Sequence, residues 1–357
     1  METANSISDY HDLDRYRTKR TRRRHRAILR GVGATLAAMA LVTAVVVVRA
    51  ATVVAEVQEK VGRDVDREAI GHVLTPPKSD EEPFYVLLLG VDRDQGREQD
   101  AESYGADESA YRSDTMLLCR IDKTNAKVTM VSMHRDTKVN VPGLGITKMN
   151  AAYSAGGAPL ACEVASKFAG VPIAHYAQVD MDGMAEIVDS LGGVDVDLPV
   201  AVSDPEYTGI DLPAGPQHLD GVTAALLCRC RHGYDAYGDG DRYRAANQRM
   251  VLSSLGKAML AQDPMRLAST VSLAADFVQT DMTVTDVIGI ALAMRGMDPA
   301  TDVMSGMEPS QGVYENETWY EECDLRAWRE MMTRVDQGLP PYEEGQADST
   351  DGVAGSA

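Results

Sequence analysis

Two short apolar runs constrain the fold most, because only the five residues DKTNA separate them. TMLLCRI (115–121) and KVTMVSM (127–133) both have the apolar, β-branched character of buried strands. A hairpin that turns near residues 124 and 125 is the simplest connection between them. Antiparallel pairing then brings residues 114 and 135 roughly opposite each other.

Charged residues gather at the open end of this predicted hairpin. RSD (112–114) enters the first strand, and HRD (134–136) leaves the second. An earlier apolar strand, FYVLLLG (84–90), is followed by VDRD; if it also pairs antiparallel, Asp92 arrives at the same edge. Any single Arg–Asp pair is more often an ordinary surface ion pair, worth about 0–1 kcal/mol. Three charged segments at one edge predict a site.

Two further segments supply arginines. AALLCRCR (224–231) reads as a strand, with Arg229 and Arg231 alternating onto one face. A helix is expected over 244–261, where Arg244 and Gln248 are four residues apart at the start of the core-facing stripe. Guanidinium groups match phosphate oxygens, and carboxylates such as Asp92 and Asp114 suit a hard cation. The pattern predicts a pyrophosphate–Mg²⁺ site.

The N-terminal region predicts a membrane anchor. An uncharged run of 18 residues (31–48) reaches 21 residues with 27–29, enough to cross about 30 Å of hydrocarbon at about 1.5 Å per residue. This length favours an uncleaved anchor over a signal peptide. Residues 1–30 hold nine Lys/Arg against four Asp/Glu, which places that end in the cytoplasm and the rest outside. The net charge of −19 argues against a general nucleic-acid binder.

These signals divide the chain into a basic tail (1–26), a single-pass anchor (27–48), a polar stalk (49–82) and a folded α/β domain (83–262). Residues 263–337 look mainly helical with a few extended pieces, packed on the same domain, and 338–357 read as disordered. Further helices are expected at 158–169 and 182–191, and a strand at 194–200. The five cysteines read as buried thiols, with a disulfide as the alternative and no metal site expected.

Seven segments in order, from LLLGVDRD through YRSDTMLLCRID and VSMHRDTKVNVPG to GDRYRAANQRMVLSSL, resemble LytR-CpsA-Psr proteins. The resemblance covers about residues 84–262 and, more weakly, the extension beyond. It implies a layered α-β-α domain with a mixed central sheet. It further implies transfer of glycopolymers from undecaprenyl-pyrophosphate carriers onto peptidoglycan in Gram-positive envelopes. The implied site has Mg²⁺, an arginine-lined pyrophosphate pocket and a greasy pocket for the prenyl chain.

The resemblance also implies roles for individual residues. Asp92 and Asp114 would hold Mg²⁺, Arg135, Asp92 and Arg112 would be catalytic, and Asp92 is the first candidate for the general base, ahead of Asp136 and Asp241. The residues implied to clamp the pyrophosphate are Arg112, Arg135, Arg229, Arg231, Arg244 and Gln248. Two departures are Asn247, where an arginine usually stands, and a long loop between Arg231 and Arg244.

Three functions remain open at this point. The leading one is an extracytoplasmic glycopolymer–peptidoglycan phosphotransferase. The second is a polyprenyl-pyrophosphate pyrophosphatase, with water as the acceptor. The third is a non-enzymatic envelope regulator of the transcriptional-attenuator type, although the acidic outer domain disfavours direct DNA contact.

Overall fold

The computed structural model describes residues 48–49, 51–91, 113–238 and 240–346. The chain divides into two compact units, residues 1–56 and residues 57–357, and the fold described below is that of the second unit. The predicted anchor at 27–48 lies almost wholly outside the described residues. Within the described part of the chain, no helix combines the length and apolar character that a membrane span needs.

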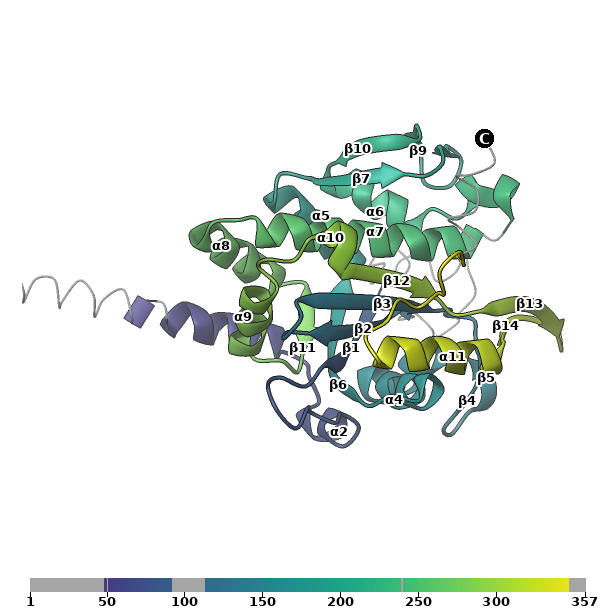
Figure 1. The fold of residues 1–357 in the computed structure, drawn as a ribbon, viewed down its shortest axis with the longest axis horizontal. Helices are drawn as coiled ribbons and strands as arrows, with labels where there is room; N and C mark the ends of the chain where they lie inside the picture. Colours follow the sequence, from purple (N-terminus) through teal and green to yellow (C-terminus); the bar gives the residue numbers. More distant parts are fainter. Residues whose placement is uncertain (1–47, 50, 92–112, 239, 347–357) are drawn as a thin grey trace, which may run out of the picture. The chain divides into compact units, whose positions relative to one another are not determined.

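A mixed six-stranded sheet forms the centre of the second unit (Figure 1). Its middle strands are antiparallel neighbours, whereas β6 runs parallel to β1 and β12 runs parallel to β3. In spatial order the strands are β11 (Val278–Thr280), β6 (Ile173–Asp180), β1 (Phe84–Val91), β2 (Ser113–Asp122), β3 (Lys127–Met133) and β12 (Val303–Met307).

Helices cover both faces of this sheet, because its middle strands are apolar on both sides. Leu87 and Leu89 face the layer of α4 (Ala151–Ala169) and α11 (Leu325–Asp336), whose Trp328 is 1% exposed. Val86 and Leu117 face the other layer. The helices of that side of the molecule are α5 (Met181–Ser190), α6 (Gly221–Arg229), α7 (Gly240–Leu260), α8 (Pro264–Ala274) and α9 (Val284–Ala293).

The remaining elements are short. A 3₁₀ helix, η1 (His232–Tyr237), precedes α7, and the short helices are α2 (Arg67–Gly71) and α10 (Pro299–Asp302). Four two-stranded ribbons pair β4 (Lys138–Val141) with β5 (Gly145–Lys148), β7 (Val194–Leu198) with β10 (Gly215–Leu219), β8 (Val202–Asp204) with β9 (Ile210–Leu212), and β13 (Ser310–Glu315) with β14 (Thr318–Cys323).

The predicted hairpin is confirmed with its register. Met116 pairs with Met133 and Asp122 with Lys127, so the same register extended by two residues sets 114 opposite 135. β1 pairs antiparallel with β2 and ends at Val91, opposite Ser113. The β1, β2 and β3 ends therefore meet at one edge of the sheet, as the charge pattern predicted.

The predicted strand at 224–231 is wrong. Residues 221–229 form α6, because the Asp220 side chain caps the helix by accepting a hydrogen bond from the Thr223 amide at 2.8 Å. Extended backbone begins only at Cys230. Arg229 therefore ends a helix and Arg231 precedes η1, so the two arginines do not share a strand face. All five cysteines are free thiols.

Two other expectations change, and one is confirmed. Val57, Val61 and Ile70, in the predicted stalk, are buried, because their apolar side chains pack against the domain. Residues 264–335 are mainly helical with a few extended pieces, as predicted, and two of these pieces, β11 and β12, join the two sides of the central sheet. Residues 338–346 are ordered against the domain, where the Tyr342 hydroxyl accepts a hydrogen bond from the Met307 amide at 2.9 Å.

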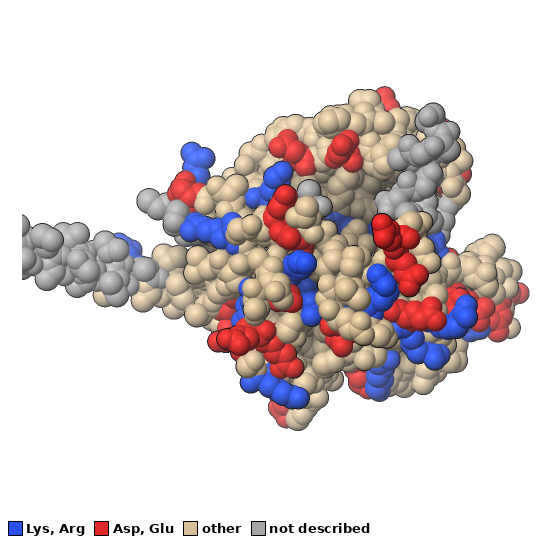
Figure 2. Space-filling view, viewed as in Figure 1, with Lys and Arg blue, Asp and Glu red and all other residues tan. Residues whose placement is uncertain are grey.

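Acidic and basic side chains are interspersed across the face seen in Figure 2.

Candidate functional site

A four-residue turn after β3 carries the central arginine. The Thr137 amide donates a hydrogen bond to the His134 carbonyl at 3.1 Å, which closes a turn with Arg135 and Asp136 at its corners. The turn is tied down further, because its Arg135 carbonyl accepts from the Asn150 amide at 3.0 Å. Lys148 Nζ lies 3.0 Å from Asp136 Oδ1. This network holds Arg135 at the edge where the strands end.

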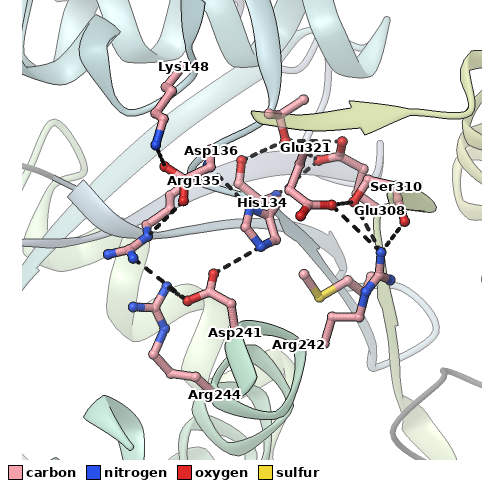
Figure 3. Close-up of polar contacts among 12 residues, drawn as sticks. His134, Arg135, Asp136, Lys148, Asp241, Arg242, Arg244, Glu308, Ser310 and Glu321 are labelled. Carbon is pink, nitrogen blue, oxygen red and sulfur yellow. Dashed lines mark hydrogen bonds and ion pairs between the residues drawn. The ribbon is translucent and has the colours of Figure 1, made fainter. Parts of the chain in front are cut away.

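Asp241, near the start of α7, joins the turn to the helix (Figure 3). Its Oδ2 lies 3.0 Å from His134 Nε2, and its Oδ1 lies 2.7 Å from Arg244 Nη2 and 3.9 Å from Arg135 Nη2. The Asp136 amide donates to His134 Nδ1 at 3.2 Å, which leaves Nε2 as the ring nitrogen that donates to Asp241. One carboxylate thus orients an imidazole and two guanidinium groups.

The charges in this cluster perturb one another. Burial would raise the pKa of Asp241, but the hydrogen bond from His134 and the charges of Arg244, His134 and Arg135 outweigh it and hold that pKa well below the usual range. For His134, burial favours the neutral ring, yet the hydrogen bond and charge of Asp241 raise its pKa overall. A permanently ionised Asp241 is a poor proton acceptor, so it is not suited to the role of general base.

Gln248 connects this cluster to an apolar cavity. A small cavity at the cluster is lined by His134, Arg135, Asp241 and Arg244, and by Thr115 and Gln248. Thr115 and Gln248 also line a second cavity of about 270 Å³, so the two cavities adjoin. The Gln248 side chain is fixed because its Nε2 donates to the Cys228 carbonyl at 3.0 Å.

The second cavity is lined almost entirely by apolar side chains. It runs between the sheet and the helices that cover it, and Leu117 of β2, Ile187 of α5 and Leu252 of α7 are among its walls. Val57 and Val61 line it too. An anion held by the guanidinium groups could therefore carry a long apolar substituent into this cavity.

The structure brings together part of the predicted site. Arg135, Arg244 and Gln248 line one cavity. Arg229 and Arg231 do not line it, although both lie beside α7: Cys228, just before Arg229, bonds Gln248, and a side chain at Gly240 would meet the Arg231 carbonyl. Asp92 and Arg112 lie outside the described residues, and of Asp114 only the backbone, in β2, is described.

The described residues alone do not form a metal site. Among them, no group of three or more His, Cys, Asp or Glu side chains is arranged to hold an ion. The carboxylate of the cluster, Asp241, already bonds His134 and Arg244. A role for Asp92 and Asp114 as Mg²⁺ ligands stays a prediction.

Sequence reasoning missed the importance of two acids. The sequence makes Asp241 only a weak candidate for the general base, although its position three residues before Arg244 on a helix signals an ion pair. Glu308, which follows β12, binds the turn that carries Arg135: its Oε2 accepts a hydrogen bond from the His134 amide at 2.9 Å. No motif marks Glu308, because it reaches the turn only through the parallel pairing of β12 with β3.

The chain is similar in sequence to a known protein family and to individual proteins. The LytR_cpsA_psr family model matches residues 44–337. The chain is 30% identical, over 73% of its length and 80% of the relative's, to the Enterococcus faecalis protein named polyisoprenyl-teichoic acid–peptidoglycan teichoic acid transferase TagU. It is 31% identical to Biofilm regulatory protein A of Streptococcus mutans, over 61% of this chain and 56% of that protein.

The fold is also found in solved structures. The crystal structure of Bacillus subtilis TagV superposes with a TM-score of 0.59 at 26% identity, over 74% of this chain and all of the TagV chain. The structure of TagT bound to LIIa-WTA superposes with a TM-score of 0.58 at 22% identity, over 74% of this chain and 94% of the TagT chain. The layered arrangement with a mixed central sheet is common to them.

Proposed function

Because the chain belongs to the LytR_cpsA_psr family, we propose that it transfers a glycopolymer from a polyprenyl-diphosphate carrier onto peptidoglycan. The relative TagU is named for transfer of teichoic acid from a polyisoprenyl carrier to peptidoglycan, which supports the substrate class.

The observation that carries the proposal is the junction of two unlike cavities. One side has Arg135 and Arg244 for the diphosphate, and the other side is an apolar space of about 270 Å³ for part of the prenyl chain. A soluble sugar phosphate has no apolar group to fill the apolar cavity. A lipid without a phosphate has no negative charge to bind the arginines. A lipid diphosphate uses both.

The chemistry follows from charge. An acceptor hydroxyl attacks the phosphorus that bears the glycopolymer, and the anhydride bond to the lipid phosphate breaks. Negative charge then builds on the departing polyprenyl phosphate, and Arg135 and Arg244, which line one cavity, would stabilise it. Mg²⁺, if bound by Asp92 and Asp114, would supply further positive charge at the diphosphate. For the general base, Asp92 remains the candidate.

The proposal includes a place in the cell. A single membrane anchor at 27–48, with the basic residues 1–26 in the cytoplasm, would hold the enzyme outside the membrane. The donor lipid and the acceptor wall are both available there. Protease accessibility of the folded domain in intact cells, compared with lysed cells, tests this orientation.

Transfer is tested with the full chain in detergent or vesicles, Mg²⁺, a polyprenyl-diphosphate-linked glycopolymer and peptidoglycan fragments. The expected product is polymer joined covalently to peptidoglycan, detected by mass spectrometry. Ala274→Phe, which fills the apolar cavity, should weaken binding of the prenyl substrate by about tenfold or more but leave binding of inorganic pyrophosphate unchanged. Ala261→Phe, at an exposed position, is the control.

The outcome also separates the alternatives. Release of free glycopolymer phosphate without attachment to peptidoglycan would identify a hydrolase. Equal prenyl binding by Ala274→Phe and the wild type would contradict the placement of the lipid. The name of the Streptococcus mutans relative keeps a regulatory role in view. A cell in which Arg244→Ala fully replaces the wild type would favour that role, because a scaffold does not need the guanidinium group.

A further inference from the structure

Glu308 is a fully buried carboxyl group directly behind the arginine-bearing turn. Its side chain is 0% exposed, and its own amide donates to the Ser132 carbonyl of β3 at 2.9 Å. Its Oε2 accepts from the His134 amide at 2.9 Å and lies 2.8 Å from Thr137 Oγ1, which is also 3.0 Å from Oε1. Glu308 therefore contacts the first and the last residue of the turn, His134 and Thr137.

The hydrogen count at Thr137 indicates the protonation state of this carboxyl. Thr137 Oγ1 lies 2.7 Å from the His134 carbonyl, which can only accept a hydrogen bond. The hydroxyl has a single hydrogen, so it cannot serve the carbonyl and an ionised carboxylate together. If Glu308 carries a proton, it donates to Thr137 and every contact is satisfied. If Glu308 is ionised, two oxygens face each other without a hydrogen between them.

Burial is the effect that favours the neutral form of Glu308. The titratable groups that face it are His134, at the end of β3, and Cys323, at the end of β14, whose thiol bonds the carboxyl. Asp241 and Glu321 interact electrostatically with His134. Burial raises the pKa of Glu308 to about 7, and this outweighs the His134 amide, the Thr137 hydroxyl, the His134 charge and the Cys323 thiol, which all favour the ionised form.

We propose that Glu308 is a positioning residue which, as a neutral carboxylic acid, pins the His134–Thr137 turn and thereby holds Arg135 for the lipid diphosphate. Its effect on catalysis rests on the proposed function. Its action is indirect: the carboxyl bonds His134 and Thr137, and these two residues frame Arg135. The same contact sets the backbone of His134, whose ring orients Asp241 toward Arg244.

Loss of the proton should loosen the turn. An ionised Glu308 can still accept from the His134 amide, but the single hydrogen of the Thr137 hydroxyl can then serve either the carboxylate or the His134 carbonyl, so one of these two contacts is lost. Transfer by the wild type should therefore decline as Glu308 ionises above about pH 7. His134 can titrate as well, so only a comparison with a variant that lacks the carboxyl proton isolates the contribution of Glu308.

Glu308→Gln is the informative variant, because an amide can donate to Thr137 and accept from His134 at every pH. It should transfer within about twofold of the wild type at pH 6 and exceed the wild type by about tenfold at pH 8.5. Glu308→Leu, which can make neither bond, should lose about tenfold at both pH values. Glu330→Gln, the same change on the exposed side of α11, should match the wild type throughout. Full activity of Glu308→Leu at both pH values would overturn the proposal.

A stability measurement tests the protonation state without any activity. A glutamate ionises near pH 4.3 in an unfolded chain, so between about pH 4.3 and pH 7 the folded wild type holds one more proton than the unfolded chain. Its stability should fall across that window relative to Glu308→Gln and then stay level. The gap in melting temperature should widen from pH 5 to pH 7.5 in favour of Glu308→Gln. A constant gap would overturn the neutral carboxyl, and absence of transfer in every variant would refute only the proposed function.

Discussion

At the scale of single residues, Asp241 is the centre of the arginine cluster. It bonds His134 and Arg244 and lies within ion-pair distance of Arg135. Like charges would otherwise push the two guanidinium groups apart, so the carboxylate keeps them close before any ligand arrives. If a diphosphate binds at this cluster, as proposed, it meets donors that are already oriented, and this lowers the cost of ordering them during the reaction.

Arg135→Lys should show how much of this depends on the guanidinium shape. Lysine keeps the positive charge but cannot bond Asp241 and a phosphate oxygen through one planar group. We expect transfer to fall by about 10²- to 10³-fold, with unfolding midpoints close to the wild type. Arg295→Lys, at an exposed site in the turn after α9, is the control. A rate near that of the wild type would show that Arg135 supplies charge alone.

The sequence predicted much of the cluster but not its acids. Hairpin register placed Arg135 opposite residue 114, and helical spacing placed Arg244 with Gln248 on one face. Both inferences depend on local geometry, which a short motif encodes. Glu308 escaped notice because its partners are His134 and Thr137, more than 170 residues earlier in the chain. Such a contact depends on which strand joins the edge of the sheet, and a local sequence pattern does not predict the order of strands in a sheet.

At the scale of elements, α5 and α6 approach each other so closely that only glycine fits between them. A Cβ atom on Gly221 would lie 2.0 Å from the Ala185 carbonyl oxygen, and the Gly221 amide donates to Asp189 at 2.7 Å. This approach sets where α6 begins. It also explains why the strand prediction at 224–231 is wrong. The alternation of cysteine and arginine that suggested a strand covers only residues 228–231, whereas Asp220 and Gly221 determine that a helix begins before them.

Gly221→Ala should therefore destabilise the domain. The added methyl group meets backbone that cannot move aside cheaply, so we expect a loss of about 1–3 kcal/mol in the free energy of unfolding. Gly256→Ala is the matched comparison, because nothing lies within 4 Å of its Cβ position on α7. It should gain about 0.5–1 kcal/mol, since alanine favours a helix interior. Urea unfolding of both variants checks the opposite signs.

At the scale of the whole molecule, the last third of the chain completes the sheet. β11 and β12 form its two outer strands, and α11 contributes Trp328 to the core beneath it. The sequence resembles the family most strongly up to residue 262, and residues 263–337 are predicted to pack on the same domain. The sheet gives the physical reason why the chain cannot be cut between these two parts: β3 and β6 would lose their outer partners.

A chain that stops after residue 262 should consequently fail to fold. It would lack Trp328 and Glu308 and would expose two strand edges to aggregation. We expect insoluble protein with no cooperative melting transition, whereas a chain that stops after residue 346 should melt like the full chain. Circular dichroism of the soluble fractions distinguishes them. A cooperative transition in the shorter chain would show that residues 263–337 are dispensable for folding.

The late arrival of both outer strands has a consequence for biogenesis. Ribosomes deliver β11 only after residue 278 and β12 only after residue 303, so the earlier strands wait without flanking partners. The order of strands along the chain thus postpones completion of the sheet until synthesis has passed residue 303.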